Sequence, residues 1–302
     1  MSALATPLRL NRVEVTPAPV LLSIVIPAYN EGRRIGEAIR RVVDYLAAQP
    51  YRSELILVDD GSTDETVDAG VAVWEELTGQ ADGVELRVLR NDRNRGKGYS
   101  VRQGMLMARG EWILFTDADL SSPIDQLDRL FAAAQEDGAD VAIGSRRTDS
   151  AEVDQPSLAR ALMSTGFRWM VRLLCVPGYG DTQCGFKLYR RSAGLTIASL
   201  QRTSRWSFDV EHLLLADRLG YQVAEVGVRW SHQEGSKIRP LWAAFGAVYD
   251  LARMRWNHRK LGHAHRPVEY ADPPASVRIG DRVYQTRPSW WPRSKRQRRT
   301  VR

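Results

Sequence analysis

The segment Trp112-Ile-Leu-Phe-Thr-Asp-Ala-Asp119 places an apolar run directly before two carboxylates. The run from Trp112 to Thr116 has the length and the aromatic and β-branched content of a buried strand. Asp117 and Asp119 follow at the point where that strand should end. Alternate residues of an extended chain point in opposite directions, so the two carboxylates approach one site only if the chain turns after Thr116. The segment therefore predicts a strand that ends in a polar site.

The sequence on both sides of this segment alternates between strand-like and helix-like patterns. Short β-rich runs are separated by stretches whose apolar residues recur at helical spacing. The predicted strands are 21–26, 54–58, 84–89, 112–116, 139–143 and 221–228, and the predicted helical segments are 36–48, 64–77, 99–108, 124–135, 156–174 and 207–219. Such alternation predicts an α/β fold, a mostly parallel sheet with helices on both faces, followed here by a C-terminal helix and a basic tail.

Polar clusters recur where predicted strands end, after Ile26, Val58, Thr116 and Gly144. In parallel sheets ligands bind at the carboxyl ends of the strands, so these clusters predict a site along that edge. The hard carboxylate oxygens of Asp117 and Asp119 suit Mg²⁺ or Mn²⁺ bridging a diphosphate. Such a metal would neutralise charge on a leaving nucleoside diphosphate as a Lewis acid.

Four motifs stand in order at the ends of the first four predicted strands. They are Ile24-Val-Ile-Pro-Ala-Tyr-Asn-Glu31, Val58-Asp-Asp-Gly-Ser-Thr-Asp64, Asn94-Arg-Gly-Lys-Gly98 and Asp117-Ala-Asp119. This series closely resembles the family 2 glycosyltransferases with the GT-A (Rossmann-like) fold, over about residues 21–255. The third motif is not a Walker P-loop, because the earlier glycine and its spacing are missing.

The resemblance implies a set of donor-binding residues at this edge: Pro27, Tyr29, Glu31, Asp60, Asp117, Ala118, Asp119 and Lys237. Within this set, the first three would border the nucleotide and Asp60 would accept a hydrogen bond from the base. Asp119 would be the principal metal ligand, with Asp117 near the ribose and the metal. Ser121 stands where some relatives have a glutamine ligand, which leaves the third metal contact open.

Motifs in the second half narrow the resemblance. Asp181-Thr-Gln-Cys-Gly-Phe-Lys-Leu-Tyr189, Arg205-Trp-Ser-Phe-Asp-Val-Glu211, Val228-Arg-Trp230 and Gly235-Ser-Lys237 resemble the polyprenyl-phosphate branch of the family. The first of them is more similar to dolichyl-phosphate β-glucosyltransferases than to mannosyl-transferring synthases. This implies an inverting hexosyltransferase that moves glucose from UDP-glucose to a polyprenyl phosphate.

Three other functions remain open at this point. GDP-mannose would serve the same reaction as donor, and a soluble phosphorylated molecule would serve as acceptor. A third alternative is not an enzyme: a GT-A-like binding module that tethers partners through its basic tail. The presence of Asp60, Asp117, Asp119 and Lys237 argues against this module.

A lipid phosphate is already an oxyanion, so its transfer needs cationic positioning more than a strong general base. The candidate acceptor-binding residues are Arg146, Arg160, Ser164, Asp209 and Glu211. Arg160 and Ser164 are one helical turn apart and therefore share a helix face. The catalytic set comprises Asp117, Asp119, Arg146 and Lys237. These candidates have simpler alternatives. Asp117 and Asp119 would belong to a solvated turn, and Arg146 and Arg160 would be solvated surface arginines. Lys237 would be an exposed loop lysine, and Asp209 and Glu211 would cap a helix.

Charge is unevenly distributed along the 302 residues. The chain has 43 Lys and Arg against 36 Asp and Glu, a net charge of +7. Residues 253–302 hold 14 basic and 3 acidic residues, or +11, so the preceding chain carries −4. An acidic body suits a metal site, and a basic tail suits an anionic membrane surface.

No apolar run approaches the ~18 residues of a membrane span, so we expect peripheral attachment of a cytoplasmic enzyme to the inner face of the membrane. Two cysteines, Cys175 and Cys184, fit a reducing compartment. The composition excludes a wholly disordered, collagen-like or disulfide-rich chain.

The sequence divides into four predicted parts: a flexible arm (1–19), the glycosyltransferase domain (20–240), an amphipathic helix (241–261) and a basic, tryptophan-containing, largely disordered tail (262–302). The helix either lies in the membrane interface or packs on the domain. The tail either touches anionic lipid or binds nucleic acid nonspecifically. No specific nucleic-acid partner is expected, and the oligomeric state is open.

Overall fold

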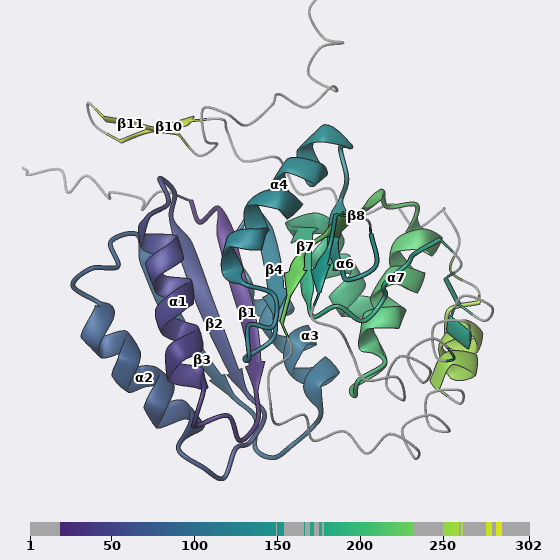
Figure 1. Ribbon diagram of the computed structural model, residues 1–302, viewed down its shortest axis with the longest axis horizontal. Helices are drawn as coiled ribbons and strands as arrows, with labels where there is room; N and C mark the ends of the chain where they lie inside the picture. The colour runs from purple at the N-terminus through teal and green to yellow at the C-terminus, as the bar shows by residue number, and fades with distance from the viewer. Residues whose placement is uncertain are drawn as a thin grey trace, which may run out of the picture.

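Seven strands form one sheet in the computed structural model of the chain (Figure 1). The structure describes residues 19–148, 150–153, 166, 170–171, 175–176, 178–231, 250–259 and 261, and the backbone of 276–279 and 282–285. The strands are β1 (Leu22–Ala28), β2 (Ser53–Asp59), β3 (Val84–Arg90), β4 (Trp112–Thr116), β5 (Val141–Ser145), β7 (Phe186–Arg190) and β8 (Val223–Gly227). Their spatial order is β3-β2-β1-β4-β7-β5-β8. All neighbouring pairs are parallel except those of β7, which is antiparallel to β4 and β5.

Helices cover both faces of this sheet. They are α1 (Ile35–Ala47), α2 (Thr66–Leu77), α3 (Lys97–Met107), the short 3-10 helix η1 (Ile124–Gln126), α4 (Leu127–Glu136), α6 (Arg191–Leu200) and α7 (Phe208–Leu219). α1 and α4 bury their apolar residues on one face, and α3, α6 and α7 on the other. Along β1, Ile24 and Ile26 belong to the first core and Val25 to the second. Because both faces are covered, every residue of β1, β2, β4 and β5 is buried, as is typical of parallel sheets.

The predicted α/β fold is confirmed: the structure has the mostly parallel sheet and the helices on both faces. All six predicted strands are present, and β4 has the predicted bounds. Five of the six predicted helical segments are present, and most of 156–174 lies outside the described residues. The sequence analysis missed β7 and α6.

The direction of β7 determines the shape of the site. In β7, Phe186 pairs with Thr116, the last residue of β4. The amino end of β7 therefore lies at the same edge as the carboxyl ends of β4 and β5. As a result, residues 181–185, which precede β7, join the edge where the site was predicted.

Two short ladders lie outside the main sheet. β6 (Glu152–Val153) pairs in parallel with β9 (Arg229–Trp230). β10 (Ser276–Ile279) pairs antiparallel with β11 (Arg282–Gln285), within the segment predicted to be largely disordered.

Residues 250–257 form a helix that packs on the domain. Leu251 and Met254 are buried in the same core as α7. Among the described residues, no helix is both long enough and apolar enough to cross a membrane. The division of the chain into four parts stays a prediction.

Candidate active site

Asp117 and Asp119 lie on a turn directly after β4. Leu120 has a φ of 45°, and its N–H donates to the carbonyl of Asp117 at 3.1 Å. A left-handed conformation costs a non-glycine residue about 1 kcal/mol, which is typical of functional sites. Asp119 Oδ1 accepts the N–H of Ser121 at 3.0 Å. The turn that the sequence required therefore forms, and both carboxylates stand at the predicted edge.

Lys97, the first residue of α3, forms an ion pair with Asp117. Its Nζ lies 2.5 Å from Asp117 Oδ1. The ammonium also lies 4.9 Å from the ring centre of Trp206 and 5.3 Å from that of Phe115. Burial disfavours the charged lysine, but the carboxylates of Asp117, Asp209 and Asp119 outweigh it and raise the pKa of Lys97. The lysine therefore stays charged beside the acidic pair.

Two further carboxylates, those of Asp119 and Asp209, lie within electrostatic reach of Asp117. Burial, together with the like charges of Asp119 and Asp209, raises the pKa of Asp117, and Lys97 offsets this only in part. A further cation at this place would lower the electrostatic energy of the cluster.

Gly185 makes room for the Asp117 carboxylate. A Cβ atom at residue 185 would overlap both the carboxylate carbon and Oδ2 of Asp117. The carbonyl of Gly185 accepts the N–H of Asp117 at 3.2 Å. Glycine is thus required here by close approach rather than by backbone conformation.

Arg146, directly after β5, is held by Asp181. The carboxylate accepts from Nε at 2.7 Å and from Nη2 at 3.0 Å, a bidentate pair. Burial opposes ionisation of Asp181, but Arg146 overrides it and keeps the pKa of this carboxyl below its usual range. The Arg146 guanidinium carbon lies 5.4 Å from the ring centre of Trp230 and interacts electrostatically with Asp117. A fixed guanidinium therefore stands at the acidic site.

The loops after β1 and β2, which carry the residues predicted to border the nucleotide, are joined by hydrogen bonds. The N–H of Asn30 donates to Ser62 Oγ at 2.9 Å, and the N–H of Glu31 donates to Thr66 Oγ1 at 2.8 Å. Pro27 belongs to β1, and Tyr29, just after that strand, is 40% exposed. Glu31 pairs with Arg34 at 2.5 Å.

Asp60 organises the loop that leads to Lys97. Its Oδ1 accepts from Asn91 Nδ2 at 2.8 Å and from the N–H of Arg95 at 2.9 Å. Its Oδ2 accepts from the N–H of Gly96 at 2.8 Å. The contact of Asp60 with a base stays a prediction, and the structure adds a role that the sequence did not indicate.

The two acidic residues in the first turn of α7 have different partners. Asp209 forms a buried ion pair with Lys187 of β7 and lies within electrostatic reach of Lys97 and Asp117. Glu211 is fully buried, and its oxygens accept backbone N–H groups of Arg202 and Thr203 and contact His258. Asp209 therefore lies close to the Lys97–Asp117 pair, whereas Glu211 holds the loop that contains Arg202 and Thr203.

The remaining predicted residues divide into described and undescribed ones. Ala118 is buried between the two aspartates. Arg160, Ser164 and Lys237 lie outside the described residues, so their roles stay predictions.

Sequence reasoning missed Lys97, Asp181 and Gly185 as site residues, although it had quoted all three inside motifs. Their positions could have indicated a role in the site: Lys97 lies in a motif that follows a predicted strand, and Asp181 and Gly185 lie just before β7. Their contacts depend on the order and direction of strands, which no single motif contains.

Two carboxylates, an ammonium and a clamped guanidinium at one sheet edge suit a ligand that carries phosphate. The family model described as glycosyl transferase family 2 matches residues 23–194. The chain belongs to glycosyltransferase family 2. A dolichyl-phosphate beta-glucosyltransferase of Drosophila melanogaster is 38% identical over 243 residues, 76% of this chain and 73% of that protein. The Mus musculus protein of the same name is 36% identical over 245 residues, 78% of this chain and 74% of that protein.

A solved structure of the glucosyl-3-phosphoglycerate synthase of Mycobacterium tuberculosis shares the fold. It aligns with a TM-score of 0.54 and 19% identity, over 79% of this chain and 80% of that one. It was solved with Mn²⁺, UDP-glucose and glycerol 3-phosphate. The GT-A fold predicted for this family 2 glycosyltransferase is therefore confirmed.

Asp117 and Asp119 fit a divalent cation. The like charges of Asp119 and Asp209 near Asp117 favour one, and carboxylate oxygens are the ligands that Mg²⁺ and Mn²⁺ prefer. Among the described residues, no three or more His, Cys, Asp or Glu side chains are placed so that they could hold a metal ion by themselves. Two carboxylates nevertheless suffice where substrate phosphates and water complete the coordination, as is usual for Mg²⁺.

Proposed function

We propose that this glycosyltransferase transfers glucose from UDP-glucose to a polyprenyl phosphate and gives a β-linked lipid-phosphate sugar. The observation that carries the proposal is the meeting of Asp117, Lys97 and Arg146 at one edge of the sheet. The relatives named dolichyl-phosphate beta-glucosyltransferase support the sugar and the acceptor. The structural neighbour solved with UDP-glucose and Mn²⁺ supports the donor and the metal.

In the proposed reaction an oxygen of the acceptor phosphate attacks the anomeric carbon of glucose, opposite to the diphosphate. A carbon–oxygen bond to the acceptor forms while the bond to the β-phosphate breaks, and UDP leaves with the electron pair. The acceptor oxygen is already anionic, so no base has to remove a proton from it. The anomeric configuration inverts because attack and departure occur on opposite faces.

Lys97 and Arg146 have different roles in the proposed reaction. Lys97 neutralises charge that develops on the departing diphosphate, a form of preorganised electrostatic stabilisation. Arg146 has five N–H donors, of which Asp181 uses two, so the guanidinium keeps donors to position the acceptor phosphate. A cation held by Asp117 and Asp119 would supply Lewis-acid stabilisation of the same diphosphate.

The donor nucleotide is proposed to lie on the loops after β1 and β2, against Pro27, Tyr29, Glu31 and Asp60. The exposed ring of Tyr29 offers a stacking surface there. Further positioning of the diphosphate by Lys237 and of the acceptor by Arg160, Ser164 and Asp209 belongs to the same proposal.

A soluble phosphorylated acceptor is a second candidate. It is favoured by the structural neighbour, which was solved with glycerol 3-phosphate. Both acceptors present an anionic phosphate, so the Arg146 site does not discriminate between them.

The enzyme is further proposed to act on the cytoplasmic face of a membrane as a peripheral protein. Leu251 and Met254 bury one side of the C-terminal helix, while Arg253, Arg255, Trp256 and Arg259 are exposed. The Arg259 guanidinium lies 3.7 Å from the ring centre of Trp256. An interfacial tryptophan beside arginines fits an anionic lipid surface. The free, buried thiols of Cys175 and Cys184 agree with a reducing compartment.

A labelled-donor assay tests the function. Purified enzyme receives UDP-glucose or GDP-mannose, with polyprenyl phosphate or 3-phosphoglycerate and Mg²⁺ or Mn²⁺. We expect labelled lipid with UDP-glucose and none with GDP-mannose. Addition of EDTA should abolish the labelling. Asp119→Asn should lower the rate by at least about a hundredfold, the usual effect of losing one electrostatic catalytic group. Asp137→Asn, an exposed carboxylate after α4, is the matched control. Labelled phosphoglycerate without labelled lipid would establish the second candidate instead.

A further inference from the structure

His258, at the end of the C-terminal helix, is buried against α7. Its Nε2 lies 2.7 Å from Glu211 Oε1, and the two side chains are 2% and 0% exposed. Two hydrogen bonds hold the backbone of His258. The N–H of His258 donates to the carbonyl of Met254 at 3.0 Å, and its carbonyl accepts from Arg218 Nη1 at 2.8 Å.

Glu211 connects this histidine to the loop between α6 and α7. Its oxygens accept the N–H of Arg202 at 3.0 Å and the N–H of Thr203 at 2.7 Å. Although burial opposes ionisation, His258 and these amides lower the pKa of Glu211. A buried carboxylate with so many donors is a rigid anchor, since losing one donor leaves charge unsatisfied in a dry environment.

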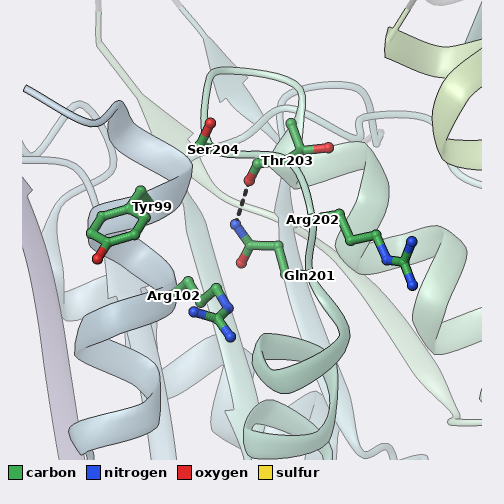
Figure 2. Close-up of a pocket in the computed structure, with 6 residues that line it drawn as sticks. All are labelled: Tyr99, Arg102, Gln201, Arg202, Thr203 and Ser204. Carbon is green, nitrogen blue, oxygen red and sulfur yellow. Dashed lines mark hydrogen bonds between the residues drawn. The ribbon is translucent and has the colours of Figure 1, made fainter. Parts of the chain in front are cut away.

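The same loop packs on the amino end of α3. Gln201 Nε2 donates to the carbonyls of Gly98 at 2.8 Å and Thr203 at 2.6 Å, and Figure 2 shows the latter bond. The carbonyl of Ser204 accepts the N–H of Tyr99 at 3.0 Å. A cavity of about 160 Å³ remains between α3 and the loop (Figure 2).

Beside this cavity, the contact is tight at Gly96 and Gly98. A Cβ on Gly98 would lie 2.8 Å from the carbonyl oxygens of Thr203 and Arg205. A Cβ on Gly96 would overlap the carbonyl of Ser204. Lys97 stands between these glycines, with the ring of Trp206 from the same loop 4.9 Å away. A shift of the loop therefore moves both Lys97 and one wall of its surroundings.

We propose that His258 is a positioning residue for the transfer reaction: by holding Glu211, it fixes the loop of residues 201–206 against α3 and thereby the Lys97 ammonium beside Asp117. His258 acts through three successive contacts and does not touch the reacting groups. The kinetic part of this inference rests on the proposed function, whereas the structural part does not.

The test compares His258→Leu with His258→Gln. Leucine preserves apolar packing but donates nothing to Glu211, whereas the glutamine Nε2 can occupy the place of the histidine Nε2. Amide hydrogen exchange of residues 202 and 203 reports the anchor directly. We expect both amides to exchange faster in His258→Leu and to stay protected in His258→Gln.

Kinetics follow in the same proteins. A displacement of a catalytic group by a fraction of an ångström to 1 Å costs about ten- to a hundredfold in rate. We therefore expect kcat to fall about tenfold in His258→Leu, with the KM for UDP-glucose changing less, and to recover in His258→Gln.

Two controls separate positioning from general destabilisation. Met254→Ala loosens the same helix without removing the Glu211 contact, so it should lower Tm but leave the two amides protected. Asp217→Asn removes an exposed carboxylate from α7 and should change neither.

Unchanged protection in His258→Leu, or equal behaviour of the leucine and glutamine variants, would overturn the proposal. If Met254→Ala lowered kcat as much as His258→Leu at equal loss of Tm, the histidine would be structural only. If the two amides respond as expected but neither the wild type nor any variant labels lipid, the proposed function is wrong. The structural role of His258 in holding Glu211 is then still supported.

Discussion

Lys97 is the residue whose importance the structure changes most. Its charge is retained by three carboxylates, and aromatic rings surround the ammonium. We predict that Lys97→Met lowers kcat by about a hundredfold, because the diphosphate loses a preorganised cation. The affinity for UDP, measured by titration calorimetry, should fall as well.

Arginine should rescue this site poorly, because its planar guanidinium does not match the space of a compact ammonium between Trp206 and Phe115. Arg41→Met, which breaks an exposed pair with Glu37, is the charge-loss control and should change neither quantity. A Lys97→Met enzyme with wild-type kcat would remove Lys97 from the mechanism.

Individual site residues were predictable where a single motif carried the chemistry. To predict the position of Asp117 and Asp119, a strand end and a following turn were enough, and the structure contains the strand end and the turn. Arg146 was found as a cation after a predicted strand, but its partner Asp181, 35 positions away, was not. The pairing depends on β7 running antiparallel beside β5, and no local pattern contains that direction.

At the scale of elements, the amino end of α3 meets the 203–205 backbone with no space for a Cβ atom at Gly96 or Gly98. Gly98 does not have a positive φ, so the requirement for glycine there is purely one of packing. We predict that Gly98→Ala destabilises the fold by about 1–3 kcal/mol, the usual cost of overpacking. The rate should fall together with the stability, because Lys97 is the adjacent residue.

Thermal unfolding and kcat measured on the same preparation check this prediction. Gly79→Ala is the matched control, since a Cβ there meets nothing within 4 Å. Its Tm should stay the same or rise slightly. Equal Tm values for the two variants would show that the α3 contact is looser than described.

There is a physical reason why the sequence pattern did not predict β7. β7 reads Phe-Lys-Leu-Tyr-Arg, and a lysine at its second position breaks the apolar run expected of a buried strand. Lys187 is nevertheless fully buried, because its Nζ donates to the carbonyl of Cys184 at 2.7 Å and pairs with Asp209. Patterning recognises strands that are apolar on both faces, so it overlooks one whose charge is neutralised by a distant helix.

At the scale of the whole molecule, charge separates between two regions of the chain. The chain before Arg253 carries −4 and holds the carboxylates of the site, whereas the basic excess begins on the exposed face of the C-terminal helix. Because His258 directly follows that helix, the surface proposed to meet the membrane and the anchor of the Lys97 loop are joined by one short element. The proposed lipid-contacting surface is therefore connected to the site through His258 and Glu211.

Vesicle flotation tests the membrane side of this arrangement. We predict that the full chain floats with phosphatidylcholine vesicles that contain phosphatidylglycerol, and not with phosphatidylcholine alone. Arg259→Gln should weaken binding about fivefold, since one basic residue near an anionic surface contributes about 1 kcal/mol. Trp256→Ala should weaken binding further without lowering Tm, because 66% of its surface is exposed.

High salt should release the protein, because screening at 1 M shortens the electrostatic range to about 3 Å. Met107→Ala, an exposed apolar residue at the end of α3, is the control and should bind like the wild type. A chain without residues 262–302 measures the share of the basic tail. If that chain loses all binding while Trp256→Ala and Arg259→Gln lose none, the tail alone contacts the lipid. The C-terminal helix would then serve only to carry His258 to Glu211.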